Sequence, residues 1–188
     1  MSALARALVL ASTILSLSAC APLEFERGLR DSGFELDGRI AVRYGDEASS
    51  GNLRWRHDAD GDEMLISNAL GQGMARIVRE GAQVTLTTAD GSEHRAADAE
   101  ALTERLLGYR LPLAGLADWV RARPAAEGAV RAQRDAQGRL AVLEQAGWRI
   151  EYLAYGAPDD LPRRLRMTYP NVELRLVIGD WRLAQALR

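Results

Sequence analysis

Residues able to carry out catalysis or to hold a metal are few in this chain, and their spacing suits neither task. The two histidines, His57 and His94, have no cysteine or carboxylate at the spacing of a zinc site. The acidic run at 58–63 places its glycine too early for a calcium-binding loop, so it predicts a solvated hairpin turn. Ser92 lies near His94 but lacks the Gly-x-Ser-x-Gly turn of a hydrolase nucleophile. We therefore expect a protein that is not an enzyme and needs no metal or cofactor.

The sole cysteine, Cys20, follows an apolar run that begins after Arg6. This run has signal-peptide length and is shorter than the roughly 20 residues that a transmembrane helix needs. The residues Leu17-Ser18-Ala19-Cys20 resemble the lipobox of bacterial lipoproteins, in which the cysteine thiol takes a diacylglycerol and the freed amine a further acyl chain. That resemblance implies a removed signal peptide at 1–19 and one mature domain at 20–188. Ala21, where many inner-membrane lipoproteins have Asp, implies the outer membrane, facing the periplasm.

The composition is that of one globular domain. Apolar residues make up 47% of the 188 residues and charged residues 27%, which excludes wholesale disorder. The mature part is long enough to bury a single core. All 24 basic residues are arginine, and 26 acidic residues leave a net charge of −2, so we expect no nucleic-acid partner.

An alternation of apolar and polar residues predicts that strands fill most of the mature chain. In the first strand, Leu36 and Ile40 fall on one side and Glu35 and Arg39 on the other. Short turns with glycine or asparagine separate the strands, which indicates an antiparallel meander. A short helix is expected at 22–31. The expected strands are 34–44, 50–58, 64–68, 74–79, 83–88, 93–96, 130–134, 140–145, 148–155, 163–169 and 172–178.

Two helical segments interrupt the strands midway. The first begins after Asp98 and ends at Gly108, and the second stops before Pro124. Each has an apolar face that must be buried, and the concave side of a curled sheet offers the place. We therefore expect a mainly β fold, a barrel-like sheet with a helical lid. The lid residues are Leu102, Leu106, Leu113, Leu116 and Trp119.

The inward-facing positions of the strands are almost wholly apolar. A packed core is one interpretation, and an apolar cavity suited to acyl chains is the other. The helical lid and the lipid anchor favour the cavity. Its expected residues are Leu36, Ile40, Val42, Trp55, Ile66, Trp148, Ile150, Tyr152, Leu165 and Met167, with Leu53, Ile77, Leu174 and Leu176 as further inward positions.

The connection at 68–73 carries a leucine where a polar turn is expected. Gly71 and Gly73 follow Leu70 and permit a tight turn there. Leu70 either folds back on the core or stays exposed as a membrane probe, which is worth roughly 1.5–3 kcal/mol when buried in lipid. We predict the second, so that Leu70 inserts into the membrane.

Together these residues resemble the LolB family, outer-membrane lipoproteins that receive other lipoproteins from a soluble periplasmic carrier and insert them into the outer membrane. Ala69 stands where the family has a proline. The resemblance covers nearly the whole chain and lies in 17–20, 34–42, 53–55, 68–71, 111–119, 145–152, Leu161-Pro162 and Trp181. It implies the LolA/LolB fold, an unclosed antiparallel barrel of about eleven strands with a helical lid over an acyl-chain cavity.

The resemblance also implies the partners: a LolA-like periplasmic carrier, the acyl chains of client lipoproteins, and outer-membrane lipid. We expect a monomer. Arg163 and Arg164 are hypothesised to steer an acidic carrier as part of a basic rim at the cavity mouth, although solvated arginine on an exposed strand face is the alternative. Two other functions stay open, a lipocalin-like binder of a small apolar ligand and a structural outer-membrane lipoprotein.

Overall fold

The computed structural model describes residues 33–97, 99–107, 113–157 and 160–184. Cys20 and the helix expected at 22–31 lie outside these ranges. Within them, the elements follow in the order β1 (Phe34–Tyr44), β2 (Glu47–Asp58), β3 (Gly61–Ser67), β4 (Gly73–Glu80), β5 (Gln83–Thr88), β6 (Glu93–Ala96), α2 (Ala99–Leu107), α3 (Leu113–Trp119), β7 (Val130–Arg134), β8 (Leu140–Gln145), β9 (Trp148–Gly156), β10 (Leu161–Tyr169) and β11 (Val172–Leu183).

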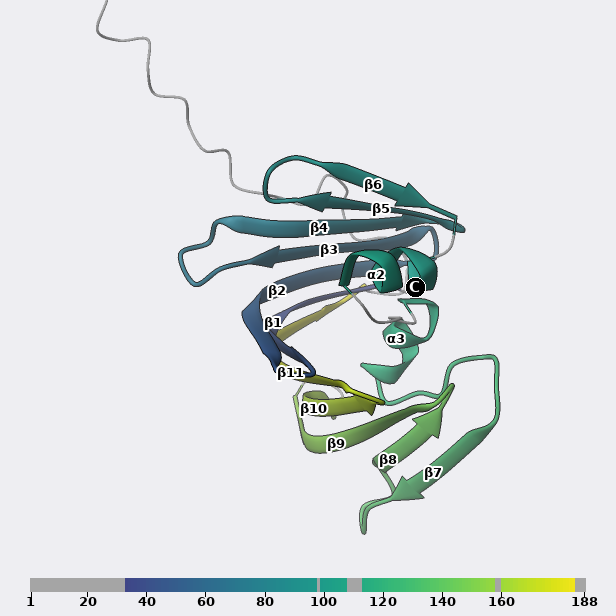
Figure 1. The fold of residues 1–188 in the computed structure, drawn as a ribbon. Coiled ribbons are helices and arrows are strands. Elements are labelled where there is room, and N and C mark those ends of the chain that lie inside the picture. The colour runs from purple at the N-terminus through teal and green to yellow at the C-terminus, as the bar shows by residue number, and fades with distance from the viewer. Residues whose placement is uncertain (1–32, 98, 108–112, 158–159, 185–188) are drawn as a thin grey trace, which may run out of the picture.

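All the described strands belong to one antiparallel sheet. Its order is β6-β5-β4-β3-β2-β1-β11-β10-β9-β8-β7, so β1 and β11 join the two halves. The edge strands β6 and β7 each have one neighbour, and the sheet therefore curls without closing. Figure 1 shows the curl, with α2 and α3 on its concave side. The expected mainly β fold of eleven strands, unclosed and covered by helices, is confirmed.

Several strands are longer than the sequence pattern predicted, and β2 and β11 show why. Strand β2 begins at Glu47 because β1 and β2 are joined by a tight turn in which Gly45 has a φ of 57°. Strand β11 continues through the glycine at 179 to Leu183, which pairs with Phe34. The register between β1 and β11 shifts at this point, which absorbs the extra residue as a bulge.

The longer β11 completes an aromatic cluster at one end of the core. Phe34 is fully buried, and its ring lies 5.1 Å from that of Trp55 and 5.3 Å from that of Trp181, both edge-on. The Trp181 indole nitrogen donates to the backbone oxygen of Pro162 at 2.9 Å. Nearby, Gly38 allows β1 and β11 to approach closely, because a Cβ there would lie 2.4 Å from the Val177 carbonyl oxygen.

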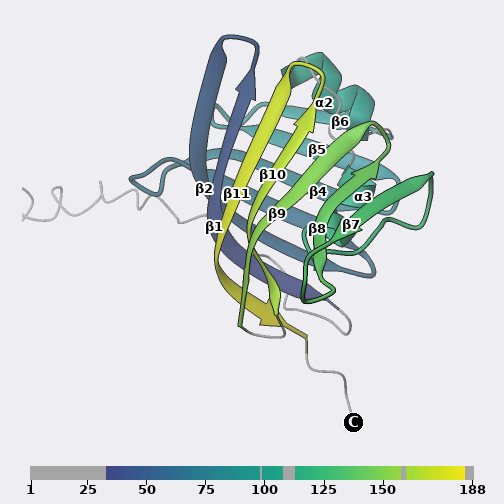
Figure 2. The same cartoon turned by 90° about the horizontal axis from the view of Figure 1, so that it is seen from below.

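The helices pack on opposite parts of the concave face. Helix α2 contacts β5 and β6, and α3 lies nearer the half of the sheet that β8 to β10 form (Figure 2). Leu102 of α2 and Trp119 of α3 are both 1% exposed, so each helix buries its apolar face as predicted. None of the described helices has the length and apolar character needed to cross a membrane.

Candidate functional site

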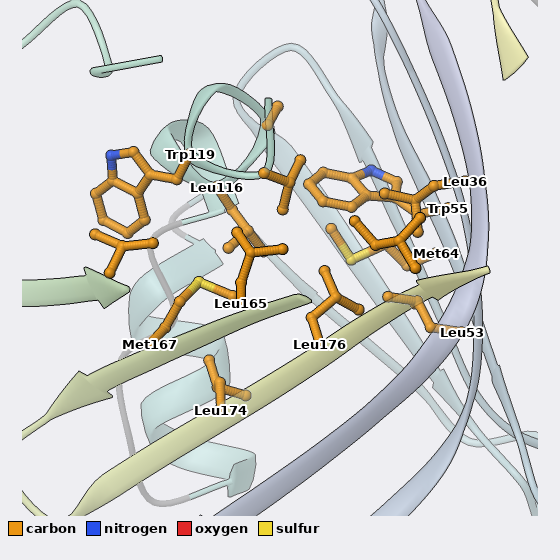
Figure 3. Close-up of a cluster of buried hydrophobic side chains, with 14 of the residues drawn as sticks. Leu36, Leu53, Trp55, Met64, Leu116, Trp119, Leu165, Met167, Leu174 and Leu176 are labelled. Atoms are coloured by element: carbon orange, nitrogen blue, oxygen red, sulfur yellow. The ribbon is translucent and has the colours of Figure 1, made fainter. Parts of the chain in front are cut away.

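A cavity lies between α3 and the concave face of the sheet. Leu116 and Val120 close it on the helix side, and Figure 3 shows Leu116 pointing from α3 toward the side chains of β10 and β11. Met74 lines the cavity and is 40% exposed, so this end of the cavity reaches solvent. The lining residues are Ile40, Val42, Ser49, Ser50, Gly51, Leu53, Trp55, Met64, Ile66, Met74, Ile77, Leu116, Val120, Met167, Leu174 and Leu176.

The cavity is small in this conformation. Its volume is about 110 Å³. A cavity of roughly 150 Å³ holds one benzene molecule, so the space as it stands fits only a short piece of hydrocarbon. A longer chain requires the walls to move apart. Three of the lining residues are methionines, whose flexible side chains adapt readily to such a change.

The sequence-predicted cavity residues divide into two groups. Ile40, Val42, Trp55, Ile66 and Met167 line the cavity. The others are buried in the solid part of the core without lining it: Leu36, Trp148, Ile150, Tyr152 and Leu165. Alternation along a strand indicates the inward face, but it cannot show which inward residues the helices cover. Met64, Met74 and Val120 were not among the predicted cavity residues, although Met64 shares the alternation of Ile66.

The lid residues have different surroundings. Leu102 and Leu116 are buried, and Leu116 lines the cavity. Trp119 is buried beside Trp148, with the two rings 6.4 Å apart. The side chains of Leu106 and Leu113 lie outside the described part of the structure.

Polar bonds that the sequence analysis did not predict hold the end of α3 against the sheet. The indole nitrogen of Trp119 donates to Gln145 Oε1 at 2.9 Å, and the Trp119 carbonyl accepts from the Tyr152 hydroxyl at 2.9 Å. Burial is the main cause that raises the pKa of Tyr152, and electrostatic repulsion from the nearby Tyr155 adds to it. The hydroxyl therefore stays a donor at neutral pH. Trp119 is therefore anchored toward β8 and β9, while Leu116 and Val120 face the cavity.

The acidic run forms the predicted hairpin turn, but the prediction that it is solvated is wrong for Asp62 and Glu63, which are buried. The turn residues Asp58 and Asp60 are accessible, but Asp62 is only 4% exposed. Asp62 accepts hydrogen bonds from the Trp55 indole at 2.9 Å and from Arg79 Nε at 2.6 Å, and it lies 2.8 Å from His57 Nδ1. Burial alone would raise the pKa of Asp62, but the bonds and charges of these partners hold it below its ordinary value.

Glu63 is buried on the other face of the sheet and is also held by arginine. Its two carboxylate oxygens accept from Arg56 Nη2 at 2.6 Å and from Arg76 Nε at 2.9 Å. Because ion pairs occupy both buried carboxylates, the run stabilises the β2–β4 part of the sheet. Among the described residues, no group of three or more histidine, cysteine or acidic side chains is placed to hold a metal.

The loop between β3 and β4 (residues 68–72, called the Leu70 loop) presents Leu70 to solvent. Leu70 is 85% exposed. Asn68 stiffens the loop, because its Oδ1 accepts from the backbone nitrogens of Leu70 at 2.9 Å and Gln72 at 3.0 Å. Gly71 takes a φ of 82°, which favours glycine. The loop is thus ordered although Ala69 replaces the family's proline.

Arg163 and Arg164 lie near the start of β10, whereas Met167 of the cavity lies further along that strand. Arg163 Nη1 donates to the Gly179 carbonyl at 2.6 Å, and Nη2 donates to the Ala157 carbonyl. Arg164 is exposed, and its docking role stays a prediction. Arg163 is engaged inside the protein, so Arg164 is the more accessible of the two.

The comparison with known sequences decides the family. Residues 32–181 match the family described as outer membrane lipoprotein LolB. The chain belongs to the LolB family. Outer-membrane lipoprotein LolB of Thiobacillus denitrificans is 44% identical over 151 residues, which span 79% of this chain and 80% of that protein. LolB of an Azoarcus species is 38% identical over 178 residues, or 90% of this chain and 91% of that one.

Solved structures support the LolB fold. A LolA superfamily protein from Nitrosomonas europaea superposes with a TM-score of 0.52 at 11% identity, covering 85% of this chain and 90% of that one. Membership of the LolB family confirms the expected location, an outer-membrane lipoprotein facing the periplasm, and the expected role as a receptor in lipoprotein localisation. The roles of the individual cavity, lid and loop residues in this LolB family member stay predictions.

Proposed function

We propose that this receptor takes the acyl chains of client lipoproteins into the cavity beneath α3 and then releases them into the outer membrane. The observation that carries the proposal is the apolar lining of that cavity, from Ile40 and Trp55 on the sheet to Leu116 on the helix. Each buried methylene is worth about 0.8 kcal/mol, so one sixteen-carbon chain left in water would cost roughly 12 kcal/mol. A receptor must therefore cover the chains until a bilayer does.

The present volume of the cavity fits this intermediate role. A site that must widen to accept a chain binds it less tightly than a preformed site of full size, because the widening costs free energy. The open edges of the sheet and the methionines Met64, Met74 and Met167 allow that widening. Release to a bilayer, which needs no such rearrangement, then stays favourable.

Release also requires contact between the cavity and the membrane. We propose that Leu70 supplies it by entering the bilayer from its stiffened loop, while an acylated Cys20, freed by removal of 1–19, tethers the whole 20–188 domain. A LolA-like carrier would deliver the cargo to this monomeric receptor. The carrier would dock against the side that carries Arg163 and Arg164, where Arg164 is the more exposed of the two. One exposed leucine adds a small, reversible contribution, so the receptor is not trapped in the lipid.

A fluorescent fatty-acyl probe tests the cavity. The Cys20→Ala protein without residues 1–19 should bind the probe saturably, and Ile66→Asn should weaken binding at least tenfold, because Ile66 is half-buried and lines the cavity. The matched control is Leu153→Asn, at an outward position that is 53% exposed. Absence of saturable binding by the unsubstituted protein would favour a structural lipoprotein. Binding of small apolar ligands but not of long chains would favour a lipocalin-like role.

A further inference from the structure

The outer face of the sheet is hollowed beside the Leu70 loop. Arg39 of β1 and Arg175 of β11 line this shallow depression together with Ala69 of the loop. Small residues such as Ala41 and Gly51 contribute to its lining, so the depression is open to a group from outside. The depression therefore lies directly beside the loop that carries the exposed Leu70, because Ala69 of that loop lines it.

Arginines surround an exposed apolar residue on this face. Val177 of β11 is 46% exposed and lies opposite Arg39 on one side and opposite Arg164 of β10 on the other. Arg175 lies two residues before Val177 on the same outward side of β11. Diagonal neighbours on a sheet are roughly 7–8 Å apart, within the reach of long side chains. Arg39 and Arg175, which both line the depression, therefore form one pair, called here the arginine face, and Arg164 lies beside it.

The arginine face has an excess of positive charge. Arg175 Nε lies 2.7 Å from Glu173, and the same carboxylate lies 3.4 Å from Arg43, so two arginines share one acid. Among the described residues, Arg39 has no ion-pair partner. This local excess stands out in a chain whose net charge is −2.

The arginine face and Leu70 are turned the same way. In Figure 1 the loop between β3 and β4 projects to the left, and the helices lie on the right. The convex side of the bend at β1 and β11 also faces left. Figure 2 shows the same loop projecting on the side away from α2 and α3. A flat surface that meets Leu70 can therefore also meet the outer side of β1 and β11.

We propose that the arginine face binds the phosphate groups of an anionic bilayer surface while Leu70 enters the apolar layer beneath them; this inference rests on the proposed membrane contact of Leu70. Guanidinium groups donate paired hydrogen bonds to phosphate oxygens. Basic residues at an anionic membrane surface are attracted electrostatically, and salt screens the attraction. The bilayer is favoured over an acidic protein because the charges accompany an exposed leucine on a projecting loop.

Vesicle flotation tests the proposal. The Cys20→Ala protein without residues 1–19 is mixed with vesicles of phosphatidylcholine, or of phosphatidylcholine with added phosphatidylglycerol. We expect tighter binding to the anionic vesicles, which salt weakens. Arg39→Gln with Arg175→Gln should weaken that binding about fivefold for each arginine lost. The control is Arg131→Gln with Arg134→Gln on the exposed edge strand β7, which removes the same charge elsewhere and should change binding little.

Three outcomes would overturn the proposal: equal binding to both kinds of vesicle, an arginine-face variant that binds like the unsubstituted protein, or a β7 control that loses as much. Loss of cargo acceptance from the carrier with unchanged vesicle binding would assign the face to the carrier instead. The variant Leu70→Glu distinguishes failure of the Leu70 proposal from failure of the arginine-face proposal. If it still delivers cargo normally but the arginine-face variant loses vesicle binding, the Leu70 proposal fails while the phosphate-binding face stands.

Discussion

The indole Nε1 of Trp119, at the end of α3, donates a hydrogen bond of 2.9 Å to the side-chain oxygen of Gln145 at the end of β8. Gln145 is 2% exposed, and its side chain makes three further bonds: its oxygen accepts from the Ala125 nitrogen at 2.9 Å, and its nitrogen donates to the carbonyls of Ala125 at 2.9 Å and Glu127 at 2.7 Å. One amide therefore ties the lid and the segment after it to the sheet, and it holds this end of α3 in place.

Gln145→Leu should lower the free energy of unfolding by about 2–4 kcal/mol, because it leaves buried donors and acceptors without partners. Urea unfolding followed by tryptophan fluorescence measures the loss. The control, Gln133→Leu on the exposed strand β7, should change the free energy by about 0.5 kcal/mol or less. Trp119→Phe combined with Gln145→Leu should cost less than the sum of the single changes, since both remove the same bond. Strict additivity would show that the two residues do not act together.

Asp62 should make the fold sensitive to acid. Its pKa in the folded protein lies below the ordinary 3.8, so the folded state binds this proton more weakly than the unfolded chain does. The stabilisation is complete above about pH 4 and is lost as the pH falls through the lowered folded pKa. Asp62→Asn should therefore cost about 2–4 kcal/mol at neutral pH and flatten the pH dependence of stability below pH 4. Urea unfolding at several pH values, with exposed Asp46→Asn as control, checks this. An unchanged slope in acid would contradict the assignment.

Leu70→Glu should leave folding and acceptance of cargo nearly unchanged and slow the transfer of cargo into liposomes. Leu70 is 85% exposed, so the substitution disturbs no packing, but a carboxylate opposes entry into the bilayer. Leu70→Met, which keeps an apolar side chain, should transfer at nearly the unsubstituted rate. The measurement charges each protein with labelled lipoprotein and follows its appearance in added liposomes. Equal rates for Leu70→Glu and the unsubstituted protein would make Leu70 an ordinary turn residue.

Arg164→Glu tests docking of the carrier without disturbing the fold. Arg164 is exposed, whereas Arg163 donates to the Gly179 carbonyl, so Arg163→Glu would also break internal hydrogen bonds. We expect Arg164→Glu to slow cargo transfer from an acidic carrier several-fold at low salt, with a smaller effect at high salt because ions screen the attraction. Transfer kinetics at two salt concentrations measure this. If Arg164→Glu accepted cargo at low salt as fast as the unsubstituted protein, Arg164 would not belong to the docking surface.

Much of the fold could be predicted because its signals are local. Alternation with a period of two marks a strand and its inward side, and residues such as Gly81 and Gly91 mark the turns between strands. The main error in strand length came at Gly179, which resembles a turn in sequence. In the structure that glycine is the extra residue of a bulge, and β11 continues to Leu183.

By itself, the sequence determined the strands, the apolar concave face, the single cysteine at the lipobox and the leucine on a turn at 70. Only the tertiary structure decided that Ile66 lines the cavity while Ile150 does not, since both alternate in the same way. It also decided that Gln145 anchors Trp119 and that Asp62 is buried against Arg79. Periodicity reports which side of a strand faces inward, whereas these contacts depend on how far the sheet curls and where the helices lie across it.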